Sequence, residues 1–473
     1  MHLDPVILSR IQFAWVIAWH ILLPAFTIGL ACYIATLEGL HLWTKQPVYF
    51  RLSAFWLRIF AISFGMGVVS GIIMPFQFGT NWSRLSDAMA NVTGPLLTYE
   101  SLTAFFLEAA FLGVLLFGRK LVPTGVHFAA ALMVALGTLF SSFWILAANS
   151  WMQTPSGYEV GPDGRFFPKD WIDVIFSPSF PFRLGHTVSA FMVTTAFVVL
   201  AVGAYTLRRG RAIAEGRVMV HMAVWFLAVM VPVQMVLGDL HGLNTREHQP
   251  AKLAAIEGLW DTGRGVPASI IGWPDETAER NDYEVAIPQL GSLYLTHEWD
   301  GEVKGLKDFP RDQRPPVPIV YFAFRTMVGI AVLMLCFVVA GVVLALRRRL
   351  TTADGYLAAA QWTAPLGFLA VLAGWTTTEV GRQPWTIYGM LRTADSVSPV
   401  LGGGDVLVSL LGYVVVYLIM FPTGIWFMVR LVQAGPAEAE RTQPPIESGR
   451  PATPVEALPT THPVTPVPRL GGD

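Results

Sequence analysis

Long apolar runs dominate this chain, and short polar stretches separate them. A helix that crosses the hydrocarbon core of a bilayer needs about 20 consecutive apolar residues. Runs of this kind predict nine spanning helices near residues 13–40, 54–76, 93–118, 124–150, 180–207, 219–239, 319–346, 358–380 and 405–433. The pattern therefore predicts an all-α integral membrane protein with about nine transmembrane helices in a bundle.

Positive charges alternate along the connections between these runs. Lys and Arg gather in every second connection, at Lys45 and Arg51, Arg119 and Lys120, Arg208 to Arg217, Arg347 to Arg349, and Arg430. Cytoplasmic loops carry such an excess of Lys and Arg. We therefore expect the N-terminus outside and the C-terminus in the cytoplasm, a parity that nine spans satisfy.

Composition agrees with a membrane protein. Hydrophobic residues make up 53% and charged residues 14% of the chain, and the mean hydropathy is +0.51. Soluble domains carry about 25% charged residues. Cys32 and Cys336 lie in apolar runs and imply no disulfide framework. Residues 1–10 do not resemble a cleavable signal peptide, and no phosphate-cradling Gly-rich motif or nucleic-acid partner is expected.

Two segments lie outside the apolar runs. Residues 240–318 form a predicted outer-side loop of about 79 residues, rich in charge, Trp and Pro. A loop of this length in a compact domain is usually functional. Residues 435–473 are rich in Pro, Thr, Glu and Ala and predict a disordered cytoplasmic tail. We expect a membrane domain over 1–434 that includes this loop, followed by the tail.

The stretch from Thr98 to Phe111 places two carboxylates, Glu100 and Glu108, in a predicted span. An ionisable residue in a transmembrane helix is costly and marks an ion path, a proton relay or a cofactor by default. In a regular α-helix, eight residues separate the pair by ~12 Å along the axis and about 80° in rotation. The two carboxylates should therefore lie on a similar face at two depths.

Other polar residues share the depth of Glu100. On the predicted topology, His20, His186 and Met327 lie one to two turns inside the outer ends of their helices, and Glu379 closes the outer end of another. Two His, one Met and carboxylates suit haem iron better than structural zinc. A His/Met pair gives a six-coordinate, low-spin, electron-transfer haem, whereas a single His or carboxylate leaves a site open for oxygen.

Eight short motifs along the chain, taken in order, resemble one family. They are Ser9-Arg-Ile-Gln-Phe13 with His20, Gln77-Phe-Gly-Thr-Asn-Trp-Ser83, Glu100-Ser-Leu-Thr-Ala-Phe-Phe-Leu-Glu108, Trp144-Ile-Leu-Ala-Ala-Asn-Ser-Trp-Met152, Gly185-His186, Lys252-Leu-Ala-Ala-Ile-Glu257, Phe324-Arg-Thr-Met-Val-Gly329 and Gly374-Trp-Thr-Thr-Thr-Glu-Val-Gly-Arg-Gln-Pro-Trp385. Over about 1–434, the chain is similar to subunit I of cytochrome bd-type quinol oxidases.

The resemblance implies roles for the polar residues that share the depth of Glu100. His186 and Met327 would be the axial ligands of a low-spin haem b, with Arg325 beside a propionate. His20, Glu100 and Glu379 would serve two high-spin haems. The residue Trp375 would lie between haems for electron transfer. Arg382 suits propionate pairing because a guanidinium binds carboxylates bidentately, and Trp385 belongs to the same cofactor-binding motif.

The resemblance also implies the substrates. Lys252 and Glu257 match the quinol-oxidising loop, with Lys252 as donor to a quinone oxygen and Glu257 as proton acceptor; without the family they would read as a surface pair. The predicted reaction oxidises two quinols outside and reduces O2 to water. Protons would come from the cytoplasm past Glu108, helped by Ser141, and proton-motive force would arise without pumping.

Two departures from the family pattern bear on the cofactors. The loop 240–318 is of the short type, and the run Trp385 to Asp395 looks like the cyanide-insensitive branch. The expected cofactors are a low-spin haem b, a high-spin haem b, and a third haem that is either haem d or a further haem b. The expected partners are subunit II in a heterodimer, with or without a small single-helix subunit, and ubiquinol or menaquinol, in a bacterial cytoplasmic (inner) membrane.

Two other classes of protein compete with this interpretation. A secondary transporter would bind a coupling ion near the midplane and show broken helices and an internal repeat. A non-catalytic haem-relay subunit would need only His186 and Met327. The relay leaves His20, Glu100, Glu108 and Glu379 without a role, and no repeat of fixed period is visible.

Overall fold

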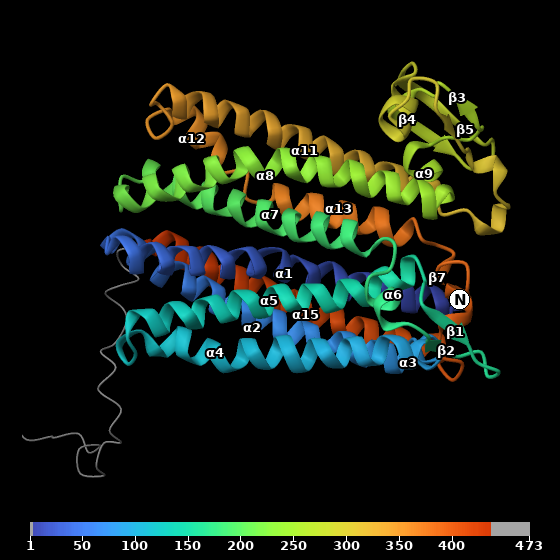
Figure 1. Ribbon diagram of the computed structural model, residues 1–473, viewed down its shortest axis with the longest axis horizontal. Coiled ribbons are helices and arrows are strands. Elements are labelled where there is room, and N and C mark those ends of the chain that lie inside the picture. The colour runs from blue at the N-terminus through green and yellow to red at the C-terminus, as the bar shows by residue number, and fades with distance from the viewer. Residues whose placement is uncertain (1–2, 437–473) are drawn as a thin grey trace, which may run out of the picture.

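Nine apolar helices run side by side in the computed structural model, which describes residues 3–436 (Figure 1). Within the described residues, eight helical spans are long and apolar enough to cross a membrane, and the ninth apolar helix is shorter. The eight spans are built by α1 (Pro5–Thr44), α2 (Pro47–Thr80), α3 (Ser83–Tyr99) with α4 (Phe106–Phe117), α5 (Thr124–Gln153), α7 (Phe180–Arg208), α8 (Ile213–His248), α11 (Val317–Leu346) and α15 (Gly403–Ala434). The prediction of an all-α membrane bundle is confirmed. The predicted tail 435–473 lies almost entirely outside the described residues.

The ninth apolar helix is shorter than predicted. The apolar run suggested a span over 358–380, but α13 covers Leu366–Val380 only. Its 15 residues reach about 22 Å, less than the ~30 Å hydrocarbon core. The preceding residues form α12 (Asp354–Ala360) and a turn that ends at Pro365. A proline lacks the N–H that a helix interior needs, so α13 starts after it.

The helices form two groups that pack against each other. Figure 1 shows α7, α8, α11 and α13 in one group and α1, α2, α4, α5 and α15 in the other. Helix α7 joins the groups because it contacts both α1 and α5. Leu37, Trp56, Phe197 and Leu227 are fully buried in the largest apolar core, which draws on both groups. Lipid tails are as apolar as these side chains, so close van der Waals packing stabilises the contacts where helix faces helix.

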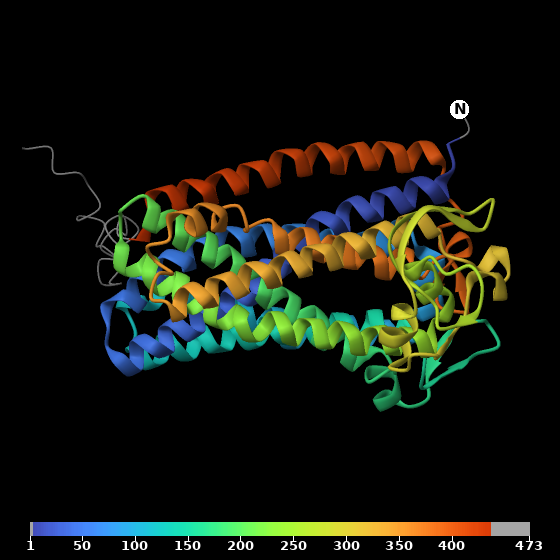
Figure 2. The ribbon, with the colours of Figure 1, turned by 90° about the horizontal axis from the view of Figure 1, so that it is seen from above.

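The long connections gather at the end of the bundle that holds the N-terminus (Figures 1 and 2). Their elements are β1 (Tyr158–Val160), β2 (Phe166–Pro168), α6 (Trp171–Ile175), α9 (Pro250–Glu257), β3 (Gly263–Arg264), β4 (Ala268–Asp275), β5 (Arg280–Ile287), α10 (Leu290–Thr296), β6 (Glu302–Val303), the 3-10 turns Leu306–Asp308 and Arg311–Gln313, β7 (Trp385–Ile387), β8 (Leu391–Arg392) and α14 (Thr393–Ser396). The strands pair antiparallel as β1–β2, β3–β6, β4–β5 and β7–β8. Because α8 continues to His248, the loop predicted from residue 240 begins later.

Local signals determine where α1 and α9 begin and end. The Asp4 side chain accepts a hydrogen bond from the Val6 N–H (2.8 Å), and Pro5 occupies the first position of α1. Helix α9 starts with Pro250 and ends at Glu257, and the following Gly258 has φ +68°. A Cβ at Gly258 would lie 3.0 Å from the Tyr321 ring, so the position needs glycine for both conformation and space.

A π-helical turn, Glu100–Phe105, joins α3 to α4. The prediction of regular α-helical pitch between Glu100 and Glu108 is therefore wrong. A π-turn wraps more residues into each turn than an α-helix. In a regular α-helix the two carboxylates would be two full turns plus about 80° apart. The π-turn reduces this excess rotation, so the two side chains come closer to the same face of the helix. Such turns are frequent at functional sites.

A buried ionic cluster closes the end of the bundle opposite the N-terminus. Glu38 is 1% exposed and accepts hydrogen bonds from Arg119 Nη2 (2.6 Å) and from the Ser53 hydroxyl. Arg119 also donates to Ser53 Oγ (2.9 Å). The cluster ties α1 and α2 to the Gly118–Lys120 turn that follows α4.

Glu38→Gln is expected to lower the free energy of unfolding by about 3 kcal/mol, because the change leaves the Arg119 charge buried without its counter-ion. Thermal denaturation of the purified protein in detergent measures the effect. Asp87→Asn, which breaks the exposed pair between Asp87 and Arg165, is the control and should change stability little. Equal losses in both variants would contradict the importance assigned to the buried cluster.

Candidate functional site

His20 projects from α1 toward α2. Its Nδ1 lies 2.9 Å from Ser70 Oγ, and its Cε1 faces Gly71, where a Cβ would approach to 3.2 Å. A metal-binding histidine usually holds one ring nitrogen in a hydrogen bond and presents the other to the metal. Because Ser70 engages Nδ1, the Nε2 atom of His20 is left for a ligand.

His186 has a comparable arrangement on α7. The amide nitrogen of Gln234, on α8, lies 3.3 and 3.4 Å from its two ring nitrogens and can engage only one of them. The ring also packs edge-on against His241, with centroids 5.6 Å apart. A Cβ at Gly238 would come within 3.3 Å of His186 Cε1. One nitrogen of His186 is therefore available for a metal.

Met327, on α11, faces α13. A Cβ at Gly374 would lie 2.8 Å from the Met327 sulfur, so only glycine leaves room for the thioether there. The next residue, Trp375, packs against a buried cluster that contains Ile21 of α1 and Phe191 of α7. The structure thus places Trp375 where α13 and α7 of one helix group meet α1 of the other.

Glu100 and Glu108 face the same side of α5. The Ser141 hydroxyl donates to Glu100 Oε1 (2.8 Å), and a Cβ at Gly137 would lie 2.6 Å from Glu108 Cγ. Ser141 and Gly137 are one helical turn apart on α5. The structure confirms that the carboxylates share a face at two depths. It places Ser141 beside Glu100 rather than beside Glu108.

Glu379 is held by polar side chains from α5, α7 and the turn that follows α13. Arg382 Nη2 donates to Glu379 Oε2 (2.5 Å), while Asn149 and Gln153 each donate from Nδ2 and Nε2 to Oε1 (3.2 Å). Arg183, also hydrogen-bonded to Asn149, lies 3.9 Å from the same oxygen. Within the described residues, Arg382 Nε and Nη1 are buried and have no hydrogen-bond partner. Two guanidinium nitrogens therefore remain free to bind an added carboxylate.

Lys252 is buried, which contradicts the alternative that it belongs to an ordinary surface pair. Its Nζ donates to Gln153 Oε1 (2.7 Å), and the side chain is 4% exposed. The aliphatic stem lies against Gly381, where a Cβ would be 2.8 Å from Lys252 Cγ. Burial, followed by the nearby Arg183 charge, lowers the pKa of Lys252 well below its usual value.

Glu257 is also buried, at 3% exposure. Tyr294 donates its hydroxyl to Glu257 Oε2 (2.5 Å), and Arg325 Nη2 lies 3.4 Å from the same oxygen. Burial raises the pKa of Glu257 despite the opposing Arg325 charge. Arg325 also donates to the carbonyls of Ile256 and Ser269. It therefore anchors the loop to α11.

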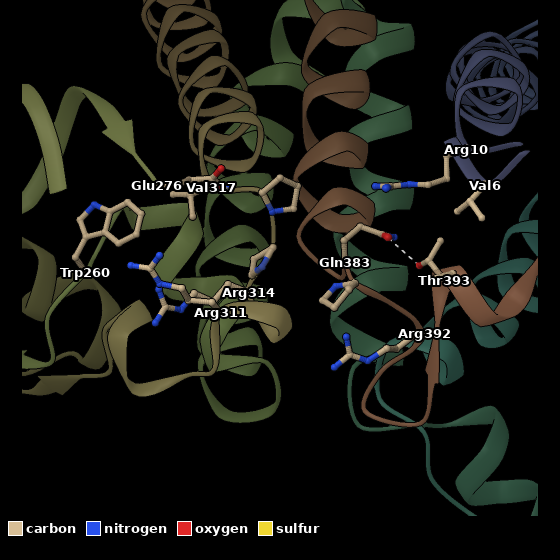
Figure 3. A pocket seen from close by; sticks show the side chains of 14 residues that line it. Val6, Arg10, Trp260, Glu276, Arg311, Arg314, Val317, Gln383, Arg392 and Thr393 are labelled. Atoms are coloured by element: carbon tan, nitrogen blue, oxygen red, sulfur yellow. Dashed lines mark hydrogen bonds between the residues drawn. The ribbon is translucent and has the colours of Figure 1, made fainter. Parts of the chain in front are cut away.

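A cavity of about 490 Å³ opens between this loop and the segment after α13 (Figure 3). Four arginines line it: Arg10, Arg311, Arg314 and Arg392. Three of them are paired, Arg311 and Arg314 with Glu279 (2.9 and 2.7 Å) and Arg392 with Asp312 (2.6 Å). Arg392 also lies over the Trp385 ring, 5.1 Å from its centroid. Neither Lys252 nor Glu257 lines the cavity, so it adjoins the loop without containing the buried pair.

The donor set fits haem better than a bare metal ion. Within residues 3–436, no three His, Cys, Asp or Glu side chains gather as a metal site. Haem needs only one or two axial ligands from the protein. The three neutral candidates, His20, His186 and Met327, each face a glycine on a neighbouring helix. The free nitrogens of Arg382 would suit a haem propionate.

Several residues of this site were not identified from sequence. Asn149 and Gln153 stand four apart at the end of an apolar run, so they share a helix face. Gln234 is a lone amide within the apolar run of α8, and Arg183 precedes His186 by three residues. A search for polar residues at helical spacing in apolar runs could have found them. Their partners could not be predicted, because each partner lies on another helix.

Comparison with known proteins agrees with the geometry. Residues 8–436 match the model of the family "Cytochrome bd terminal oxidase subunit I". The chain is 34% identical to "Cytochrome bd ubiquinol oxidase subunit 1" of Bacillus subtilis (strain 168), over 92% of this chain and 94% of that protein. It is 31% identical to "Cytochrome bd-II ubiquinol oxidase subunit 1" of Escherichia coli (strain K12), over 94% of this chain and 100% of that protein. The bd oxidase structure from Geobacillus thermodenitrificans superposes with a TM-score of 0.86 at 28% identity and covers 92% of this chain and 99% of that one.

Proposed function

The chain belongs to the family of cytochrome bd terminal oxidase subunit I, and from that premise we propose that it oxidises quinol at the outer face and reduces O2 with cytoplasmic protons. At the level of the family, the protein is a multi-pass membrane subunit of a haem-containing quinol oxidase, which works in a complex with other subunits. This membership rules out the transporter and the non-catalytic relay.

The observation that carries the finer proposal is a hydrogen-bonded link between Lys252 of the quinol loop and Glu379 of the proposed haem site. Lys252 donates to the Gln153 side chain, and the same amide donates to Glu379. A residue implied in quinol oxidation thus stands one side chain away from a residue implied in haem binding. This proximity suits a reaction in which electrons leave quinol at the loop and pass to the haems proposed to bind near Glu379.

The loop residues would prepare quinol for oxidation. Lys252 would donate a hydrogen bond to a quinone oxygen, and Glu257 would accept a proton from the opposite hydroxyl. The raised pKa of Glu257 makes it a better proton acceptor than an exposed carboxylate. Protons that leave Glu257 would pass to the outer side, where the loop and the N-terminus lie.

Haem, when bound, would supply one-electron transfer and the iron that reduces oxygen. His186 and Met327 would hold a low-spin haem b, and His20, Glu100 and Glu379 would hold a high-spin haem b and a third haem, either haem d or a further haem b. Trp375 would lie between haems. Arg325 and Arg382 would orient propionates, with Trp385 completing the motif.

Glu108 would deliver protons from the cytoplasmic side. It is 7% exposed and lies deeper than Glu100 on the shared face toward α5. A carboxylic acid can take up a proton at one end of this face and release it toward the other. Because quinol protons leave on the outer side and the protons of water enter from the cytoplasm, proton-motive force would arise without pumping.

The assembly would comprise this chain, subunit II and, in some forms, a small single-helix subunit. We place it in the bacterial cytoplasmic (inner) membrane, with loop and N-terminus outside. Within the chain, residues 1–434 would form the haem-binding domain, the residues between α8 and α11 (249–316) the quinol loop, and 435–473 a cytoplasmic tail. Ubiquinol and menaquinol are both suitable substrates.

Reconstitution tests the function directly. The purified complex in proteoliposomes, supplied with a ubiquinol or menaquinol analogue, should consume O2 and acidify the side that carries the loop. A pH dye trapped inside the vesicles and an oxygen electrode measure the two effects. Oxygen consumption with acidification on the opposite side would overturn the proposed orientation of the two half-reactions.

The pH dependence of quinol oxidation should be bell-shaped. Glu257 must be ionised to accept a proton, so activity should rise as pH increases through its raised pKa. Lys252 must be charged to donate strongly, so activity should fall as pH increases through its lowered pKa. Steady-state rates from pH 5 to pH 10 are expected to lose the rising limb in Glu257→Gln, with the falling limb kept. An unchanged rising limb would remove Glu257 as the proton acceptor.

A further inference from the structure

Gln153 connects three parts of the fold through one side chain. It is the last residue of α5 and is 1% exposed. Its Oε1 accepts from Lys252 Nζ (2.7 Å) and from Gln249 Nε2 (3.1 Å), and its Nε2 donates to Glu379 Oε1 (3.2 Å). The backbone carbonyl of Gln153 also accepts from Gln249 Nε2 (2.8 Å), which satisfies a free carbonyl at the end of α5.

These contacts require an amide. A side-chain amide offers an acceptor oxygen and a donor nitrogen on the same group. At residue 153 the oxygen faces the Lys252 ammonium, so the nitrogen is left to face the Glu379 carboxylate. A carboxylate there would repel Glu379, an ammonium would repel Lys252, and an apolar side chain would leave both without this partner.

Lys252 has little freedom to find another acceptor. Its stem is confined by Gly381, and the side chain is cut off from solvent. Gln153 Oε1 is the hydrogen-bond acceptor of the Lys252 ammonium among the described residues. Loss of that acceptor would strand a buried charge, which is far more costly than loss of an exposed hydrogen bond.

We propose that Gln153 is a positioning residue for quinol oxidation, which holds the Lys252 ammonium in place and ties its position to Glu379. The inference rests on the proposed role of Lys252 toward quinol. A change at residue 153 should therefore affect both Lys252 in the quinol loop and Glu379 in the proposed haem site. The two ends should respond separately to different substitutions.

Three variants in the full oxidase complex separate the ends. Gln153→Met removes both contacts and should raise the KM for quinol about tenfold or more, since hydrogen bonds to charged groups are the strong ones. Gln153→Glu keeps an acceptor for Lys252 and repels Glu379. It should leave the KM near the wild-type value and shift the absorption and CO-difference spectra of the reduced haems. Gln313→Met is the control, because Gln313 is exposed and lies in the loop that also contains Lys252. It should change neither the KM nor the spectra.

Further measurements distinguish positioning from damage to the fold. Haem content per protein should stay at the wild-type value in all variants, which shows that the fold and the haem sites are kept. In the double variant with Lys252→Met, loss of Gln153 should add no further effect on the KM. A wild-type KM in Gln153→Met, or additive effects in the double variant, would overturn the inference. A wild-type KM in Lys252→Met alone would instead overturn the proposed function of Lys252.

Discussion

Glu108→Gln is expected to reduce O2 consumption about 100-fold or more, because a glutamine of nearly the same shape cannot carry a proton. Glu108 is buried against Gly137, so the packing of α4 on α5 should be kept. Oxygen-electrode measurements with excess quinol give the turnover. Reduction of the haems by quinol under anaerobic conditions should proceed normally, since electron entry does not depend on Glu108.

Two comparisons make this result specific. Glu159→Gln, at an exposed position on β1, should keep full turnover. Glu108→Asp, which keeps the acid on a shorter side chain, should recover part of the activity. Wild-type turnover in Glu108→Gln would mean that protons reach the site of O2 reduction by another route. That result would contradict the proposed role of Glu108.

Met327→Leu is expected to convert the low-spin haem to a high-spin form or to remove it. Leucine has a similar volume to methionine and no sulfur to bind iron. The contact of residue 327 with Gly374 should therefore remain while the ligand is lost. Reduced-minus-oxidised spectra with and without CO, together with pyridine haemochrome analysis, report the spin state and the haem content.

Met334→Leu provides a matched control on the same helix. Met334 is 4% exposed and lies in the main apolar core, so its replacement tests packing alone. Its low-spin spectrum should match that of the wild type. An unaltered low-spin spectrum in Met327→Leu would refute the assignment of Met327 as an axial ligand.

Local sequence determined much of the fold because the spans depend on runs of neighbouring apolar residues. Eight predicted spans correspond to long helices in the described part of the chain. The exception, α13, shows the limit of this signal. An apolar run extends through Pro365, but backbone hydrogen bonding does not, so hydropathy alone overestimated the helix.

Candidate site residues could be singled out in the sequence, but their contacts could not be predicted. Lys252 and Glu257 could be singled out by resemblance, yet their burial was not visible in the sequence. Lys252 finds its acceptor on Gln153, 99 positions earlier, and Glu379 finds two of its donors on α5. Pairings over such separations depend on which helices become neighbours.

The sequence by itself determined the membrane class and the order of the helices, and it singled out the candidate site residues, because apolar length, charge alternation and short motifs are local properties. Tertiary structure decided the rest. It turned the Glu100–Glu108 helix through a π-turn, set glycines against His20, His186 and Met327, and joined Lys252 to Glu379 through Gln153. The glycine contacts and the Gln153 link depend on close packing between different helices, where the space left by a glycine or the single amide of a glutamine determines which groups can meet.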